Sequence, residues 1–225
     1  MARNPRFAPP GYWLHLTQGG DGQQEIFRHD GDRRKYLELL AAHAEERQIQ
    51  VMGYCLMSNH VHLIALGKYP DAISQWMRDL NGHYAQRMQS LEERRGRFWQ
   101  DRFFSCALDE HHLRTALLYA ELNPVRHGLV TDATTYPWSS AASHTGQTKC
   151  APFLNQHEFG HRYYTSDWRL ALAFPQPPSE LAAIRLATRL GQPLGSPEFL
   201  AHLEAEFDVV LPRTLVAAKA MRASA

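Results

Sequence analysis

The sequence is poor in cysteine, and the three cysteines that it has stand far apart. Cys55, Cys106 and Cys150 are odd in number and form no Cys-x-x-Cys pair within the 225 residues. A framework of disulfide bonds or a zinc site made of cysteines is therefore not expected. We expect the three side chains to be buried structural thiols.

The sequence also lacks long apolar runs. No stretch reaches the roughly 18 apolar residues that a membrane-spanning helix needs. The first ten residues do not contain the apolar segment of a secretion signal. Hydrophobic residues nevertheless make up 44% of the chain, so a packed core is expected and general disorder is not. We expect a cytoplasmic protein with no membrane partner.

An excess of positive charge is absent as well, since the formal net charge is only +1. A nucleic-acid-binding protein is usually basic as a whole, so only local clusters favour such a partner. One cluster places four arginines among four aromatic side chains, and a second lies near residue 34: Arg94, Arg95, Arg97, Arg102 with Phe98, Trp99, Phe103, Phe104; and Arg33, Arg34, Lys35. Cations beside aromatic rings suit single strands. A solvated loop beside core aromatics would give the same pattern.

The hydrophobic spacing predicts strands and helices in a defined order over about the first half of the chain. The expected elements are a strand, a helix, two strands, a helix, a strand and a helix, at 12–17, 33–47, 50–57, 60–66, 70–88, 103–108 and 110–122. Ser58 and Asn59 suit a tight turn between the paired strands, and Pro124 limits the last helix. This order is typical of an α+β, ferredoxin-like or RRM-like core, with an antiparallel sheet and helices on one face.

The remainder of the chain is less regular. Pro175, Pro177 and Pro178 indicate a linker, and residues 179–190 and 197–207 are expected to form two short helices. We therefore divide the chain into a core domain over residues 1–145 and a partly helical C-terminal extension over residues 146–225.

The strongest local signal is a pair of histidines in the strand at 60–66. Side chains alternate between the faces of a strand, so His60 and His62 project the same way, about 7 Å apart along the backbone. Two imidazoles on one face can hold a divalent metal, but a further ligand must come from elsewhere. The His-x-His pattern alone also occurs in structural and surface positions.

A second signal lies at the end of the helix at 110–122. Tyr119 and Asn123 are four positions apart and share a helix face. A tyrosine hydroxyl is a poor nucleophile at neutral pH, and a metal that polarises a phosphate would assist its attack. Asn123 offers an amide oxygen as a third ligand. Two imidazoles, an amide oxygen and open positions suit Mg²⁺ or Mn²⁺ without excluding zinc. Read alone, Tyr119 is equally suited to a half-buried core position.

Residues 6–145 resemble the REP-associated tyrosine transposases, within the HUH single-tyrosine transposase superfamily. The resemblance depends on the order and spacing of several stretches. In addition, Ala187–Gly195 resembles the C-terminal part of the family's proteins. The stretches are Arg6–Gly11, Asp32–Leu40, Tyr54–Ile64, Phe98–Phe103, Tyr119–Arg126 and Tyr136–Ser140.

The resemblance implies an HUH catalytic domain in which His60 and His62 bind a metal and Tyr119 is the nucleophile. Asn123 matches the position of the family's polar third ligand. The implied substrate is single-stranded DNA with imperfect palindromic hairpins, cut and rejoined through a 5′-phosphotyrosine intermediate in a prokaryotic, nucleoid-associated setting. Expected DNA contacts are Arg6, Arg33, Arg34, Arg94, Arg95, Arg97, Trp99, Arg102 and Arg126.

The sequence departs from the family pattern at a few positions. Ser58 stands where proline is usual, Gly19 and Gly20 replace an arginine–glycine pair, and His127 replaces a common alanine. The first change suits a turn, and the second puts one arginine contact with DNA in doubt. We set His127 aside as incidental.

Two other functions are compatible with parts of this pattern. The same fold order serves non-catalytic RNA-binding modules, whose sheet aromatics stack on bases. A small zinc hydrolase would use His-x-His with more ligands, but His111 and His112 are neighbours on a helix and do not face one way.

The sequence leaves open whether the protein acts as a monomer or a homodimer.

Overall fold

The computed structural model describes residues 7–92 and 96–211. The predicted order of strands and helices is confirmed, and Arg6, Arg94 and Arg95 lie outside the described residues. The elements are β1 (Trp13–Gly19), η1 (Asp21–Gln23), α1 (Asp30–Glu46), β2 (Ile49–Leu56), β3 (His60–Gly67), α2 (Ala72–Glu92), β4 (Phe104–Ala107), α3 (Glu110–Glu121), α4 (Asn123–Arg126), η2 (Ala133–Thr135), α5 (Ala141–His144), α6 (Gln156–Arg162), α7 (Thr165–Leu172), α8 (Pro178–Leu190) and α9 (Pro197–Phe207).

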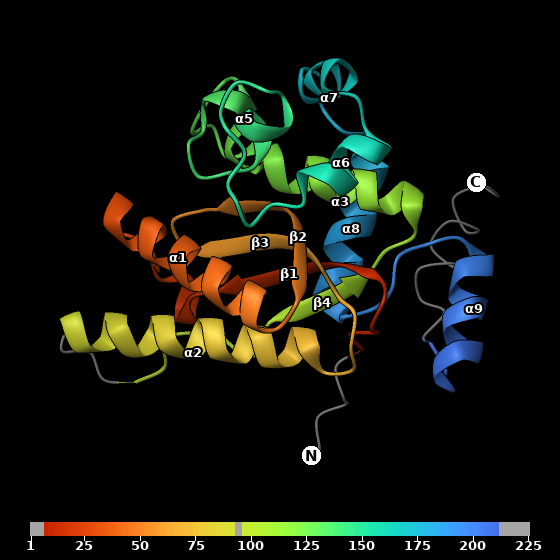
Figure 1. Ribbon diagram of the computed structural model, residues 1–225, viewed down its shortest axis with the longest axis horizontal. Helices are drawn as coiled ribbons and strands as arrows, with labels where there is room; N and C mark the ends of the chain where they lie inside the picture. Colours follow the sequence, from red (N-terminus) through yellow and green to blue (C-terminus); the bar gives the residue numbers. More distant parts are fainter. Residues whose placement is uncertain (1–6, 93–95, 212–225) are drawn as a thin grey trace.

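The four strands form one antiparallel sheet in the order β2-β3-β1-β4 (Figure 1). β1 and β3 are central, which agrees with their nearly continuous burial. Gly19 at the end of β1 pairs with His60 at the start of β3. This arrangement is that of the ferredoxin-like fold, so the predicted α+β fold class is confirmed.

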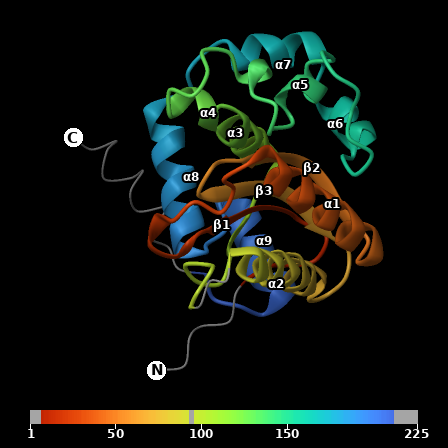
Figure 2. The same ribbon diagram turned by 90° about the vertical axis from the view of Figure 1, so that its left-hand side faces the viewer.

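The face of the sheet that carries Leu14, Leu16, Val61 and Leu63 is covered by α1 and α2. These side chains are fully buried in one cluster with Trp76 of α2, and α2 lies beneath the strands in Figure 2. Burying apolar side chains is the main stabilising term of such a layer. The predicted helical layer on one face is thus present.

A second helical layer, which the sequence did not predict, covers the opposite face. α3 packs on β1, β2 and β3, and α8 packs on β4, β1 and α3. Leu113 and Leu117 of α3 are buried there with Ile64 of β3. Because side chains alternate along β3, His60 and His62 share this face with Ile64 and lie beneath α3.

Gly53 allows α3 to approach the sheet closely. The register of β2 against β3 shifts between Val51 and Gly53, which marks a bulge. A Cβ at Gly53 would lie 2.6 Å from Leu117 Cδ2 of α3, closer than real contacts allow. The missing side chain therefore lets α3 dock over the two histidines.

The C-terminal segment packs directly on the core. Asn155 N donates to Val51 O of β2, and Leu194 N donates to Ala107 O of β4, each at 2.7 Å. The two helices predicted for this segment are present as α8 and α9. The boundary predicted at residue 145 stays a prediction.

None of the helices in the described part of the chain could span a membrane. Of the three cysteines, Cys55 and Cys106 are buried and Cys150 is partly exposed.

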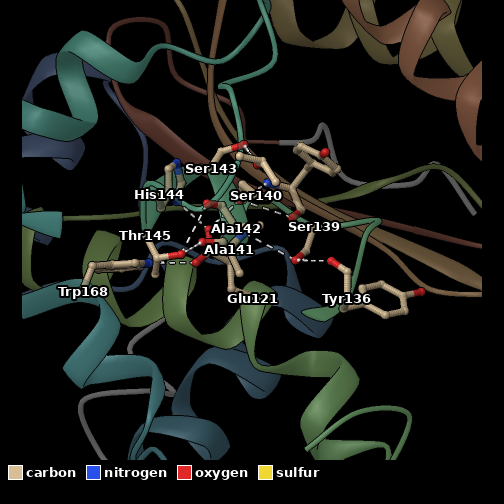
Figure 3. A network of polar contacts seen from close by, with 12 residues as sticks. Glu121, Tyr136, Ser139, Ser140, Ala141, Ala142, Ser143, His144, Thr145 and Trp168 are labelled. Atoms are coloured by element: carbon tan, nitrogen blue, oxygen red, sulfur yellow. Dashed lines mark hydrogen bonds and ion pairs between the residues drawn. The ribbon is translucent and has the colours of Figure 1, made fainter. Parts of the chain in front are cut away.

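A buried glutamate joins α3 to the segment that follows it (Figure 3). Glu121 has no exposed surface. Its carboxylate accepts hydrogen bonds from Ser140 Oγ at 2.5 Å, His144 Nδ1 at 2.5 Å and Trp168 Nε1 at 2.8 Å. Ser140 in turn accepts from Tyr54 N of β2. One carboxylate therefore connects α3, the sheet, α5 and α7.

We expect Glu121→Gln to destabilise the fold, because the amide replaces a charged acceptor of three buried donors. Hydrogen bonds to charged groups contribute about 1.5–3 kcal/mol each, so a loss of roughly 2–3 kcal/mol is expected in the free energy of unfolding measured in urea. Glu45→Gln, at an exposed position of α1, is the matched control and should change it by less than about 0.5 kcal/mol. Equal stability of the two variants would contradict a structural role for the network.

Candidate active site

The second helical layer brings four of the sequence-predicted residues together. His60 and His62 come from the start of β3, Tyr119 from the last turn of α3, and Asn123 from the start of α4. The rings of His60 and His62 have centroids 4.9 Å apart, and the ring of Tyr119 lies 5.4 Å from that of His62. Residues about 60 positions apart in the sequence therefore line one site.

Asn123 enters the site because the helix changes direction before Pro124. α3 ends at Glu121, and Pro124 occupies the first turn of α4, where a missing N–H is tolerated. Asn123 is 2% exposed, and its Nδ2 lies 3.4 Å from His60 Nε2. The two ends of an amide are assigned from their surroundings, and a half-turn would direct Oδ1 at the same point. This position suits a third ligand.

Each of the two histidines has one ring nitrogen with a single long contact or with no hydrogen-bond partner. His60 Nδ1 donates to Asn59 Oδ1 at 2.7 Å, which leaves the lone pair on Nε2. His62 Nδ1 lies 2.9 Å from His15 Nε2, whereas His62 Nε2 is buried and has no hydrogen-bond partner. A buried polar atom without a partner is costly, and a ligand would remove that cost.

Burial keeps both rings uncharged. Loss of hydration lowers the pKa of His60 to about 4, with further contributions from His127 and Arg126. Burial also lowers the pKa of His62 well below its ordinary value, with contributions from the neighbouring histidines and Arg126. At neutral pH both imidazoles therefore keep a lone pair, the state that binds a metal.

The donor set fits a divalent cation. Within residues 7–92 and 96–211, no three histidine, cysteine, aspartate or glutamate side chains gather in a way that could hold a metal. Two neutral imidazoles and an amide nevertheless lie together near Tyr119. Nitrogen and oxygen donors of this kind can hold a divalent cation.

Arg126 lies directly over the ring of Tyr119. Its guanidinium carbon is 4.2 Å from the ring centroid, and Nη2 donates to the Tyr119 carbonyl. Arg185 of α8 lies 5.9 Å from the same centroid. Burial lowers the pKa of Arg126, but a guanidinium stays protonated in proteins. Two guanidinium groups therefore lie near the phenol ring, where they would attract a negatively charged ligand.

The loop before β4 reaches the same end of the sheet. Gln100 N donates to Gly19 O, and Trp99 pairs with Gly20 next to the strand position opposite His60. Arg97 and Arg102 are exposed on this loop, and Trp99 is half-buried with its Nε1 donating to Asn81 O. The predicted basic and aromatic segment thus lies beside the histidine end of the site.

Arg33 and Arg34 lie in the first turns of α1. Phe27 N, just before α1, donates to Ser58 O in the turn that leads into His60, so this helix end is also near the site. Arg34 is exposed. Arg33 is 13% exposed and is packed between Phe27 and Trp138, with its charge 3.7 Å from Asp30. Of the two, Arg34 has the more accessible charge.

Sequence reasoning missed several residues of the site. His15 of β1 and Thr188 of α8 are buried behind His62. The alternation of β1 was the available signal for His15, because it faces the same layer as Trp13. His127, which we set aside, has its ring 6.2 Å from that of His60. No local signal connected Thr188 with the histidines.

Comparison with known proteins identifies the family of the chain. The IS200-like transposase family matches residues 11–123, which include every residue of the His60, His62, Tyr119 and Asn123 set. No protein with a curated description matches the chain.

Two solved structures are similar. One is a REP-associated tyrosine transposase bound to a REP hairpin, with 18% identity, a TM-score of 0.56, and coverage of 68% of this chain and 90% of that one. The other is a putative transposase from Deinococcus radiodurans R1, with 19% identity, a TM-score of 0.38, and coverage of 53% and 95%. The first of these shares the fold, which confirms the resemblance that the motifs indicated. With half of its length matched by that family, the chain belongs to the IS200-like transposases.

Proposed function

We propose that this transposase is a metal-dependent single-strand DNA endonuclease and strand transferase that acts through a 5′-phosphotyrosine at Tyr119. The observation that carries the proposal is the position of the Tyr119 ring, 5.4 Å from the ring of His62, whose buried Nε2 has no partner. A nucleophile beside neutral imidazoles that can bind a cation suits phosphoryl transfer better than simple binding.

His60, His62 and Asn123 would hold the cation, which we propose to be Mg²⁺ or Mn²⁺. When bound, it would polarise the scissile phosphate and offset its negative charge. The chain's own part is to keep both imidazoles neutral through burial and to direct their lone pairs to one side through Asn59 and His15. Ordered, neutral ligands lower the cost of assembling the site.

Tyr119 would attack the phosphorus through its hydroxyl oxygen. A bond forms between this oxygen and phosphorus, the bond from phosphorus to the 3′ oxygen of the preceding nucleotide breaks, and the phenolic proton passes to solvent. The released 3′ oxygen takes a proton and becomes a hydroxyl. Arg126 and Arg185 stabilise the charge that develops near the phenol. Because the phosphodiester energy is kept in the tyrosine ester, another 3′-hydroxyl can reverse the reaction and join strands.

The proposed substrate is single-stranded DNA that folds into a palindromic hairpin. The related structure with the same fold is described as bound to a REP hairpin. In this chain, Arg97, Trp99 and Arg102 lie on the loop beside the histidines. Arg34 is exposed near the start of α1, which follows the segment bonded to the turn before His60. Cations and a half-exposed ring near the histidines suit a phosphate backbone with unpaired bases.

One chain contains the whole proposed site. Within one chain, the ring of His62 lies near the rings of His60 and Tyr119, and Asn123 lies near His60. These contacts support cleavage by the tyrosine in cis. We therefore propose that a monomer can carry out the first chemical step.

Tyr119→Phe should abolish cleavage of hairpin DNA and leave hairpin affinity within about threefold, because only the nucleophilic oxygen is removed. Cleavage is measured with labelled hairpin DNA and Mn²⁺ on a denaturing gel, where the wild-type protein also gives a covalent adduct. Tyr164→Phe, at a position that is 77% exposed, is the matched control and should cleave normally.

Cleavage by Tyr119→Phe would remove Tyr119 from its proposed role. Binding of the hairpin by the wild-type protein with neither cleavage nor an adduct would favour the non-catalytic nucleic-acid-binding module instead.

His60→Ala and His62→Ala should each lower Mn²⁺ affinity by more than about 100-fold. This loss exceeds the usual effect of removing a residue that only hydrogen-bonds to a metal ligand. Mn²⁺ binding is followed by electron paramagnetic resonance, and chelation with EDTA should stop cleavage by the wild-type protein. His202→Ala, whose side chain is 66% exposed on α9, should bind Mn²⁺ normally. Unchanged affinity in both site variants would show that the cation binds elsewhere.

A further inference from the structure

A buried chain of hydrogen bonds leads from the candidate active site to the C-terminal segment. His15 lies in the middle of β1 and has no exposed surface. Its Nε2 is 2.9 Å from His62 Nδ1, and its Nδ1 is 2.9 Å from Thr188 Oγ1 of α8. The His15 and His62 rings are nearly parallel, with an interplanar angle of 12°. Both nitrogens of His15 are therefore used, one toward each neighbour.

Only two arrangements of protons satisfy this chain when the rings are neutral. A neutral imidazole has one N–H and one bare nitrogen, and each 2.9 Å contact holds one proton. In the first arrangement, His62 Nδ1–H donates to His15 Nε2, and His15 Nδ1–H donates to Thr188 Oγ1. In the second, every donor is reversed, from the threonine hydroxyl toward His62.

The two arrangements differ at His62 Nε2. The first leaves a lone pair on His62 Nε2, which is the atom needed by a cation. The second puts a proton on His62 Nε2, and that N–H would be buried without an acceptor, since no partner lies within hydrogen-bond distance. A buried N–H without an acceptor is rare in folded proteins and costs free energy. The first arrangement is therefore favoured.

We propose that Thr188 and His15 are positioning residues that hold His62 in the tautomer able to bind a divalent cation, and that α8 is thereby part of the active site. The proposal rests on the proposed function, because it assigns a cation to His62. Hydrogen bonds behind a ligating histidine commonly orient the ring and select its tautomer in this way.

We call the hydrogen-bond chain from Thr188 through His15 to His62 the relay. Other contacts hold α8 in the position that the relay needs. Arg185 of α8 lies over the Tyr119 ring, and Glu180 Oε2 lies 3.3 Å from Thr115 Oγ1 of α3. α8 ends at Gly191, whose φ of 64° is left-handed and favours glycine. The stretch Ala187–Gly195 therefore contains both Thr188 and the glycine that ends α8. This stretch resembles the C-terminal part of the family's proteins, but it had no role in the predicted chemistry.

Thr188→Val removes the hydroxyl at nearly constant volume, and Thr188→Ser restores a hydroxyl. In the full chain we expect Thr188→Val to lower Mn²⁺ affinity about tenfold, at the low end of the usual effect of such neighbours, while Thr188→Ser stays within about threefold of wild type. Thermal unfolding of both variants checks that the fold is kept. His15→Phe, which keeps a ring but removes both nitrogens, should lower the affinity at least as much as Thr188→Val.

The second readout is the tautomer of His62, measured without metal by nitrogen-15 NMR of histidine-labelled protein. The His62 signals are assigned by their absence in His62→Ala. We expect an unprotonated Nε2 in wild type and in Thr188→Ser, and partial protonation of Nε2 in Thr188→Val. A wild-type His62 protonated at Nε2, or a folded Thr188→Val with wild-type affinity and tautomer, would overturn the relay.

Failure of the relay is distinguishable from failure of the proposed function. If His62→Ala loses Mn²⁺ binding and Thr188→Val does not, the cation site stands and the relay is wrong. If His62→Ala binds Mn²⁺ like the wild type, the cation site is wrong, and a relay that serves it is wrong as well.

Discussion

The structure depends on the docking of α3 against the second face of the sheet. This contact places Tyr119 over His62, and two features of the chain make it possible. Gly53 has no side chain to hold Leu117 away, and the buried carboxylate of Glu121 binds three donors from segments beyond α3. Glu121 is two positions from Tyr119 and two from Asn123, so the network that holds the helix end also sets both site residues. The three hydrogen bonds to this buried carboxylate therefore fix where the end of α3 lies.

The second requirement is that buried imidazoles stay neutral. Burial lowers the pKa of His15 to about 3 and that of His60 to about 4, and positive side chains nearby act in the same direction. The cost of burying these polar rings is offset by the partners of their other nitrogens, Asn59 for His60 and His15 for His62. His62 Nε2 has no partner and His60 Nε2 has only the contact with Asn123, so these two nitrogens are available to a ligand. Structure and proposed chemistry therefore depend on the same hydrogen bonds.

Much of this arrangement could be predicted from the sequence, because the relevant signals are local. Strand alternation placed His60 and His62 on one face, helical spacing related Tyr119 to Asn123, and hydrophobic periodicity gave the order of the core elements. The rest depends on distant contacts. Glu121 reads as an ordinary helical glutamate until its partners at 140, 144 and 168 are known. Thr188 is 173 positions from His15, and the second helical layer arises from packing of apolar faces that many topologies would allow.

The most direct test of the account is to find the residue that becomes linked to DNA. The wild-type protein is incubated with a single-stranded hairpin and Mn²⁺, digested with trypsin and nuclease, and analysed by mass spectrometry. We expect one nucleotide-bearing peptide, with the phosphate on Tyr119. A phosphate on another residue, or efficient cleavage that leaves free ends and no linked peptide, would contradict the central claim that Tyr119 is the nucleophile.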